Sequence, residues 1–143
     1  MATKRQPHWL SLDKLPLFTH LVTGMLQDTE KLLPLFHQAK EQPWGLDDAT
    51  VNRTIKLYTE RLDILADNQE QIERWRNGTL TTQQKQAIDK LANQTAQTKK
   101  AVTQLLAIAE EIKKNTIDRI LRRDEVALAI DVLSGKLKLP KNP

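Results

Sequence analysis

The chain has 143 residues, of which 28% are charged and 39% hydrophobic, and its formal net charge is +4 at pH 7. This length suits one domain with a buried core, and the composition is that of an ordinary globular protein. Because the sequence contains no cysteine, disulfide frameworks, thiolate metal sites and cysteine nucleophiles are excluded.

The composition favours helices, since only four residues are glycine and only 4% are aromatic. The first ten residues carry positive charge but lack the apolar core of a secretory signal. No apolar run approaches the roughly 20 residues of a membrane span. We therefore expect a cytoplasmic protein without a membrane partner. We also expect a flexible arm at residues 1–10, one helical-bundle domain at residues 11–135 and a flexible tail at residues 136–143.

The first predicted helix begins near Ser11 or Asp13, either of which can act as an N-cap. Apolar residues then follow at the alternating three- and four-residue spacing of a helix face. Pro34 falls inside this pattern and deletes the hydrogen bond to the carbonyl of Glu30. We therefore expect a kink or a short break there, with the helix ending near Gln42.

The tetrapeptide LPLF occurs twice in this helix, at residues 15–18 and 33–36. The copies are 18 residues apart, which is about five helical turns, so both can point the same way. We interpret them as two ends of one buried stripe. The alternative is a short linear motif presented twice to a partner.

The second and third predicted helices are separated from their neighbours by clear breaks. Residues 42–48 contain Pro, Gly and two aspartates, and Asp47 or Asp48 can cap the second helix. Asn77 and Gly78 end it, with Gly78 expected in the left-handed conformation. Thr81 followed by Gln84 forms a capping box for the third helix.

The third helix is expected to continue through Leu121, and a shorter fourth helix is expected from Asp124 to Ser134, burying Val126, Ile130 and Leu133. The connection between the second and third helices is short, so they must be antiparallel neighbours. The sustained three-four spacing predicts the shallow crossing angles of bundles and coiled coils. The predicted fold is all-α, an elongated antiparallel bundle of three long helices plus a short C-terminal helix.

Three polar residues, Gln69, Thr95 and Thr98, lie on otherwise apolar stripes. Such residues can fix register or oligomeric state when they are buried. The alternative is that these positions reach solvent, and the sequence leaves the two open.

The sequence shows no recognisable catalytic or cofactor motif. Its glycines are never closer together than 21 residues, so no backbone loop can wrap a phosphate. His20 and His37 are 17 residues apart, about 25 Å along a helix, and no glutamate is followed by histidine three residues later. We therefore predict no enzyme activity, no cofactor and no metal.

Two surfaces are candidates for binding. The first helix has more apolar residues than two neighbours can cover, which predicts a homodimer surface comprising Leu17, Leu21, Leu35 and Phe36. Residues 113–143 carry eight Lys or Arg and four Asp or Glu. A basic helical face there could contact nucleic acid, through Lys113, Lys114, Arg119, Arg122 and Arg123. The leading hypothesis is a non-catalytic, self-associating interaction or scaffolding module, and the alternative is a nucleic-acid-associated protein.

Overall fold

The computed structural model describes residues 9–135, which form four α-helices and two short 3-10 helices. The α-helices are α1 (Leu15–Ala39), α2 (Asp48–Arg76), α3 (Thr82–Lys113) and α4 (Ile117–Leu133). The 3-10 helices are η1 (Leu12–Lys14) and η2 (Pro43–Gly45). The expected tail at residues 136–143 and most of the expected N-terminal arm lie outside the described residues.

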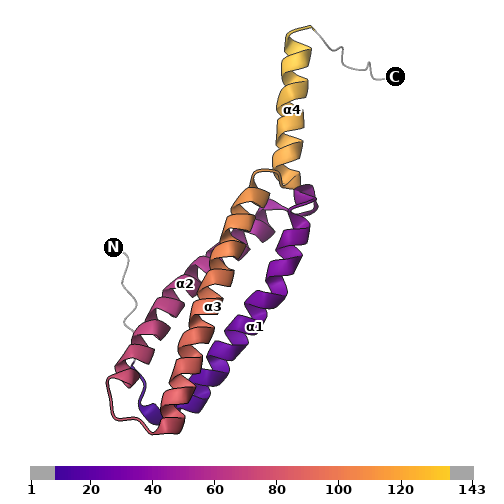
Figure 1. Cartoon of the computed structure of the whole chain (residues 1–143). Helices are drawn as coiled ribbons and strands as arrows, with labels where there is room; N and C mark the ends of the chain where they lie inside the picture. The colour runs from indigo at the N-terminus through magenta and orange to yellow at the C-terminus, as the bar shows by residue number, and fades with distance from the viewer. Residues whose placement is uncertain (1–8, 136–143) are drawn as a thin grey trace, which may run out of the picture.

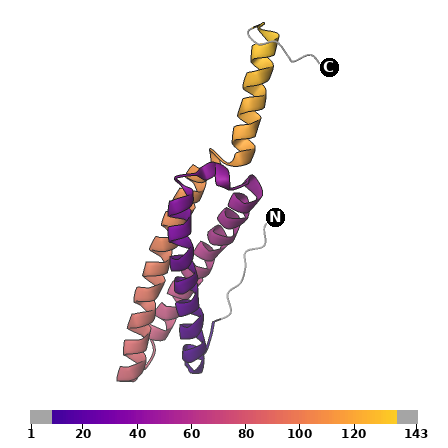
Figure 2. The ribbon, with the colours of Figure 1, turned by 90° about the vertical axis from the view of Figure 1, so that its right-hand side faces the viewer.

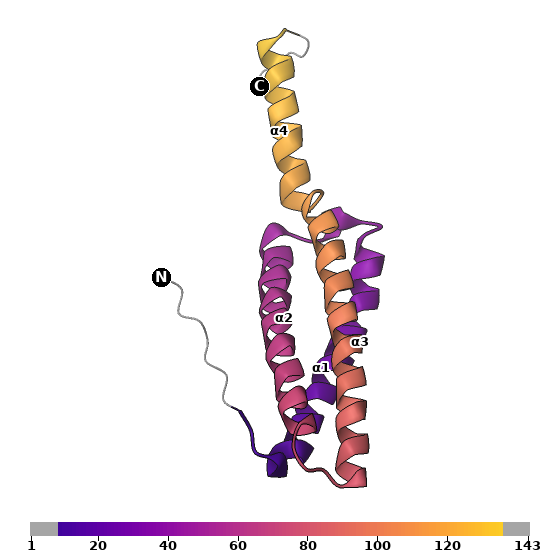
Figure 3. The ribbon, with the colours of Figure 1, turned by 60° about the vertical axis from the view of Figure 1, so that its left-hand side comes forward.

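Helices α1, α2 and α3 run side by side as an antiparallel bundle, and α4 extends away from one end of it (Figure 1). The same arrangement is visible after rotation, in Figure 2 and Figure 3. This confirms the predicted all-α fold, an elongated bundle of three long helices plus a shorter C-terminal helix.

Helix α3 provides the common packing surface, because both α1 and α2 pack extensively against it. Its buried face follows the predicted three-four spacing, at Ile88, Leu91, Thr95, Thr98, Ala101, Val102, Leu105, Ile108, Ala109 and Ile112. The core divides into two clusters along this face. One contains Phe36, Val51 and Leu105, towards the end from which α4 leaves, and the other contains Phe18 and Trp75 at the opposite end.

The helix starts of α2 and α3 are capped as the sequence predicts. Asp47 caps α2, since its Oδ1 accepts a hydrogen bond from the backbone N–H of Thr50 at 2.8 Å. Thr81 and Gln84 form the full capping box, with reciprocal hydrogen bonds of 3.1 and 2.9 Å. The expectation for Gly78 is wrong: among the described residues only Gly135, just after α4, has a positive φ, at 77°.

Helix α1 runs through Pro34 without a break, so of the expected kink or short break the break does not occur, and the helix ends at Ala39 rather than near Gln42. Pro34 itself is exposed, whereas Phe36 beyond it is buried and anchors the last turns to the core. The repeated LPLF motif supplies Leu15 and Phe18 to one core cluster and Phe36 to the other. The interpretation as a buried stripe is therefore confirmed.

The polar residues expected on the apolar stripes divide into two groups. Thr95 and Thr98 are fully buried, and the Thr98 hydroxyl donates to the carbonyl of Gln94 at 2.8 Å. Gln69 is exposed instead, and the buried glutamine is Gln71. The Gln71 side chain accepts from the backbone N–H of Leu10 at 2.6 Å and donates to its carbonyl at 3.4 Å, which fixes the approach of the chain to η1.

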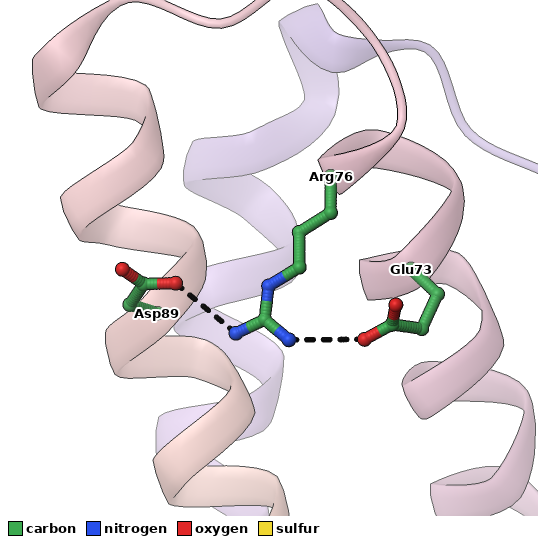
Figure 4. A network of polar contacts seen from close by, with 3 residues as sticks. All are labelled: Glu73, Arg76 and Asp89. Atoms are coloured by element: carbon green, nitrogen blue, oxygen red, sulfur yellow. Dashed lines mark hydrogen bonds and ion pairs between the residues drawn. The ribbon is translucent and has the colours of Figure 1, made fainter.

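An exposed polar network joins α2 to α3 near their connection (Figure 4). The Arg76 guanidinium lies 2.9 Å from Oε1 of Glu73 on its own helix and 3.0 Å from Oδ1 of Asp89 on α3. Pairs at the surface contribute little stability, so this network supports the helix pairing set by the core rather than determining it.

Candidate interaction surface on helix α4

Helix α4 begins at a sharp junction with α3. Thr116 is fully buried there and is the N-cap of α4, with its hydroxyl oxygen 3.4 Å from the backbone N–H of Arg119. The same hydroxyl donates to Oδ1 of Asp48, at the start of α2, at 2.6 Å. The expected continuation of the third helix through Leu121 and the expected start of the fourth at Asp124 are therefore both wrong.

Two further hydrogen bonds attach the start of α4 to the start of α2. Asp118 Oδ2 accepts from the backbone N–H of Asp48 at 2.7 Å, and the backbone N–H of Ile117 donates to the carbonyl of Leu46 at 3.0 Å. These bonds satisfy N–H groups that a helix start otherwise leaves unpaired. The base of α4 is thus fixed on the bundle, where it packs against η2 and α2.

Beyond its base, α4 has no described neighbour, and none of its residues is buried. Val126, Ile130 and Leu133, which were expected in the core, are 54%, 57% and 87% exposed. The expectation is wrong because α4 points away from the bundle instead of folding back along it (Figure 1). Its apolar side chains consequently face solvent in the single chain.

At about 100° per residue, the side chains of α4 separate into two opposite faces. The first, which we call the acidic face, comprises Ile117, Leu121, Leu128 and Val132, flanked by Asp118, Asp124, Glu125 and Asp131. The second, the basic face, comprises Val126, Ile130 and Leu133 with Arg119, Arg122 and Arg123. Every acid of the helix lies on one face and every arginine on the other.

The basic face forms one side of an open groove of about 460 Å³ at the junction with α3. Its lining residues are Lys114, Arg119, Arg122, Arg123, Val126, Ala127 and Ile130. The structure thus brings together four of the five predicted basic residues. Lys113 does not line the groove.

Most of these cations already have a neighbour. Arg119 Nε lies 3.6 Å from Asp48 Oδ2, Arg123 donates to the side chain of Asn115 at 2.9 Å, and Lys114 pairs with Glu111 at 3.1 Å. Within the described residues, Arg122 forms no ion pair.

The predicted dimer surface on α1 is only partly available. Leu17, Leu21 and Leu35 are 54%, 58% and 60% exposed, but Phe36 is 6% exposed and belongs to the core, so its assignment to the surface is corrected. Leu17 and Leu21 are one turn apart, whereas Leu35 lies about 21 Å further along the helix. The three leucines therefore do not form one continuous patch.

The histidines and acidic residues that were considered as metal ligands do not come together in the described structure. His20 and His37 are exposed on separate turns of α1. Among residues 9–135 there is no group of three His, Cys, Asp or Glu side chains placed to hold a metal ion. No helix in the same range combines the length and the apolar character that crossing a membrane requires.

The contact between Asp48, Thr116 and Asp118 was not predicted from the sequence, which offered Asp48 only as a possible N-cap of α2. A signal was present, because a threonine followed two residues later by an aspartate is typical of a helix start. Comparison with family models, curated proteins and solved structures finds no match for this chain.

Proposed function

We propose that this chain is a non-catalytic helical interaction module that associates with itself. The observation that supports the proposal is the exposure of α4, a 17-residue helix with no buried residue. Most helical stability in proteins comes from packing an apolar face rather than from the intrinsic propensity of the residues. Covering both apolar faces of α4 would supply that packing.

The exposed leucines of α1 offer a second surface for the same role. Leu17 and Leu21 could pack against another helix, but they lie apart from Leu35 and carry less apolar area than the two faces of α4. We therefore propose α4 as the main contact and α1 as an auxiliary one.

Sedimentation equilibrium across the micromolar range tests this proposal. The expected result is an average mass that rises with concentration above the 16.4 kDa of one chain. Replacing Val126, Ile130 and Leu133 by serine should lower the association, while Leu57→Ser on α2, which is 46% exposed, should leave it unchanged. A mass of one chain at every concentration would contradict the proposal.

The groove also supports a second candidate, binding to nucleic acid. Four cations converge there, and Lys and Arg contacts to phosphate supply the salt-dependent part of such affinity. Two observations weigh against it: Arg119 and Arg123 already have partners, and the groove is lined by no aromatic side chain on which bases could stack. Titration with labelled duplex and single-stranded DNA and RNA at low salt tests this candidate, and the absence of binding to all of them would exclude it.

A further inference from the structure

The separation of charge on α4 indicates what covers this helix. Asp124, Glu125 and Asp131 form no ion pair within the described part of the chain, although three arginines stand on the same helix. The two signs are centred on opposite sides of the helix, and no ion pair joins an acid of α4 to an arginine of α4 in the described structure. The acidic face thus combines an apolar stripe with three carboxylates that form no ion pair among the described residues. The basic face combines an apolar stripe with three arginines, of which only Arg119 forms an ion pair within residues 9–135.

Neither face is suited to pairing with its own copy. Antiparallel pairing of two acidic faces would place Asp118 and Glu125 of the two copies along one edge of the contact and Asp124 and Asp131 along the other, all of them negative. Like charges placed opposite each other destabilise a contact. Pairing of two basic faces would bring six arginines into one contact and supply no acid for them.

We propose that the acidic face of α4 in one copy packs on the basic face of α4 in a second copy, with the two helices antiparallel. This inference rests on the proposed function and names the surface that carries it. The complement that each face lacks, an apolar stripe with the opposite charge, is present on the other face of the same helix.

The antiparallel direction follows from the steric requirements of the two bundles. Packed helices lie about 8–10 Å apart, which is less than the width of a three-helix bundle whose helices are each about 10 Å across. Parallel α4 helices would therefore bring the two bundles into collision, whereas antiparallel helices place the bundles at opposite ends of the contact. Figure 1 shows that α4 extends beyond the end of the bundle.

One antiparallel register brings apolar residues together and also places opposite charges beside each other. It sets Asp124 beside Arg122 and Glu125 beside Arg123 of the second copy, because flanking residues on the same edge of each face meet in an antiparallel pair. In the same register, Leu121 meets Val126 and Ile117 meets Ile130. Four consecutive contacts along the helix are thus either apolar or oppositely charged.

The contact joins two different faces, so each copy in a pair keeps one face free. Such heterologous contacts close into rings or continue as open assemblies. We therefore expect species larger than a dimer at high concentration. Because the ion pairs are at the surface, added salt should weaken the association.

Charge reversal of each face tests the pairing directly. The basic-face variant is R122E/R123E and the acidic-face variant is D124R/E125R; Arg119 and Asp118 are left unchanged because they contact α2. The matched control is K99E/K100E, a reversal of the same size at two exposed positions of α3. Far-ultraviolet circular dichroism checks that each variant remains folded.

Sedimentation equilibrium should show the native protein and the K99E/K100E control associating alike. Each α4 variant alone should dissociate at least about tenfold more readily, equivalent to about 1.4 kcal/mol. An equimolar mixture of the two variants should associate again, because each then meets a face of opposite charge.

The outcomes separate this inference from the proposed function. If the native protein associates but either α4 variant alone associates equally well, or if the mixture does not recover, the charge pairing is wrong while self-association stands. If the native protein stays monomeric, both proposals fail. If only the basic-face variant dissociates while the acidic-face variant associates like the native protein, the pairing is also overturned, because the acids would then have no part in the contact.

Discussion

The hydroxyl of Thr116 donates a hydrogen bond of 2.6 Å to the carboxylate of Asp48, 68 residues earlier in the chain. This bond joins the first turns of α4 and α2, and the backbone N–H of Asp48 donates a hydrogen bond to Oδ2 of Asp118 at 2.7 Å. The chain therefore bends after α3 instead of continuing as one helix, and the bend sets the direction in which α4 leaves the bundle.

Replacing Thr116 by alanine should lower the free energy of unfolding by about 1–3 kcal/mol, because it removes a buried N-cap side chain and its hydrogen bond to the half-buried Asp48. Denaturant unfolding followed by circular dichroism measures this loss. Thr116→Ser retains the hydroxyl and should stay close to the native value. Thr103→Ala, at an exposed threonine of α3, is the matched control, and equal losses at both threonines would contradict the role of Thr116.

Gln71 should be important for holding the segment before η1. Its side chain is 4% exposed and bonds both backbone groups of Leu10, whose carbonyl also accepts from the Trp75 indole at 3.1 Å. Gln71→Ala should lower the free energy of unfolding by about 1–3 kcal/mol, since the Leu10 N–H loses its partner. Gln69→Ala, two residues away and exposed, should have almost no effect. Similar losses for the two variants in denaturant unfolding would rule out the assigned contact.

Asp47 should make stability depend on pH in the acid range. Hydrogen bonding by the side chain of Thr50 and then by its backbone lowers the pKa of Asp47 below its ordinary value of 3.8. A carboxylate whose pKa is lowered by folding stabilises the folded state at pH values above its ordinary pKa. This stabilisation is lost as the pH falls through the pKa of the folded state.

The free energies of unfolding of the native protein and of Asp47→Ala should therefore differ more at about pH 7 than at about pH 2. Asparagine can also act as an N-cap but does not titrate. Asp47→Asn should consequently keep the same stability difference from Asp47→Ala at both pH values. A native-to-alanine difference that is independent of pH would contradict the assignment.

The two prolines of the LPLF motifs should differ in their effect on stability. Pro34 lies inside α1, where it removes a helical hydrogen bond, whereas Pro16 is in the first turn, where no such bond is lost. Pro34→Ala should raise the free energy of unfolding by about 1–3 kcal/mol. Pro16→Ala should change it little, and thermal unfolding of both variants gives the comparison. A stabilisation at Pro16 equal to that at Pro34 would contradict this account.

The bundle could be predicted from the sequence because its information is local and periodic. The stripe of α3 recurs every three or four residues, and Asp47, Thr81 and Gln84 are helix-start residues whose partners lie within three positions. The short break that was one of two expectations at Pro34 does not occur, because burial of Phe36 holds the helix on the core past the proline.

The end of the chain could not be predicted in the same way. Thr116 and Asp48 act through a contact between distant segments, which periodicity does not report. Val126, Ile130 and Leu133 have the spacing of buried residues, but spacing alone does not say which molecule covers them. Phe36 was placed on the dimer surface for a related reason, since a wide apolar stripe does not reveal where its exposed edge begins.

Hydrogen–deuterium exchange of the amides in α4, followed by mass spectrometry over a range of protein concentrations, tests the central claim most directly. If α4 is an uncovered helix that a second copy covers, residues 117–133 should exchange rapidly in dilute solution and become protected as concentration rises, while α3 stays protected throughout. Protection of α4 that equals that of α3 in dilute solution, or that does not change with concentration, would contradict the claim.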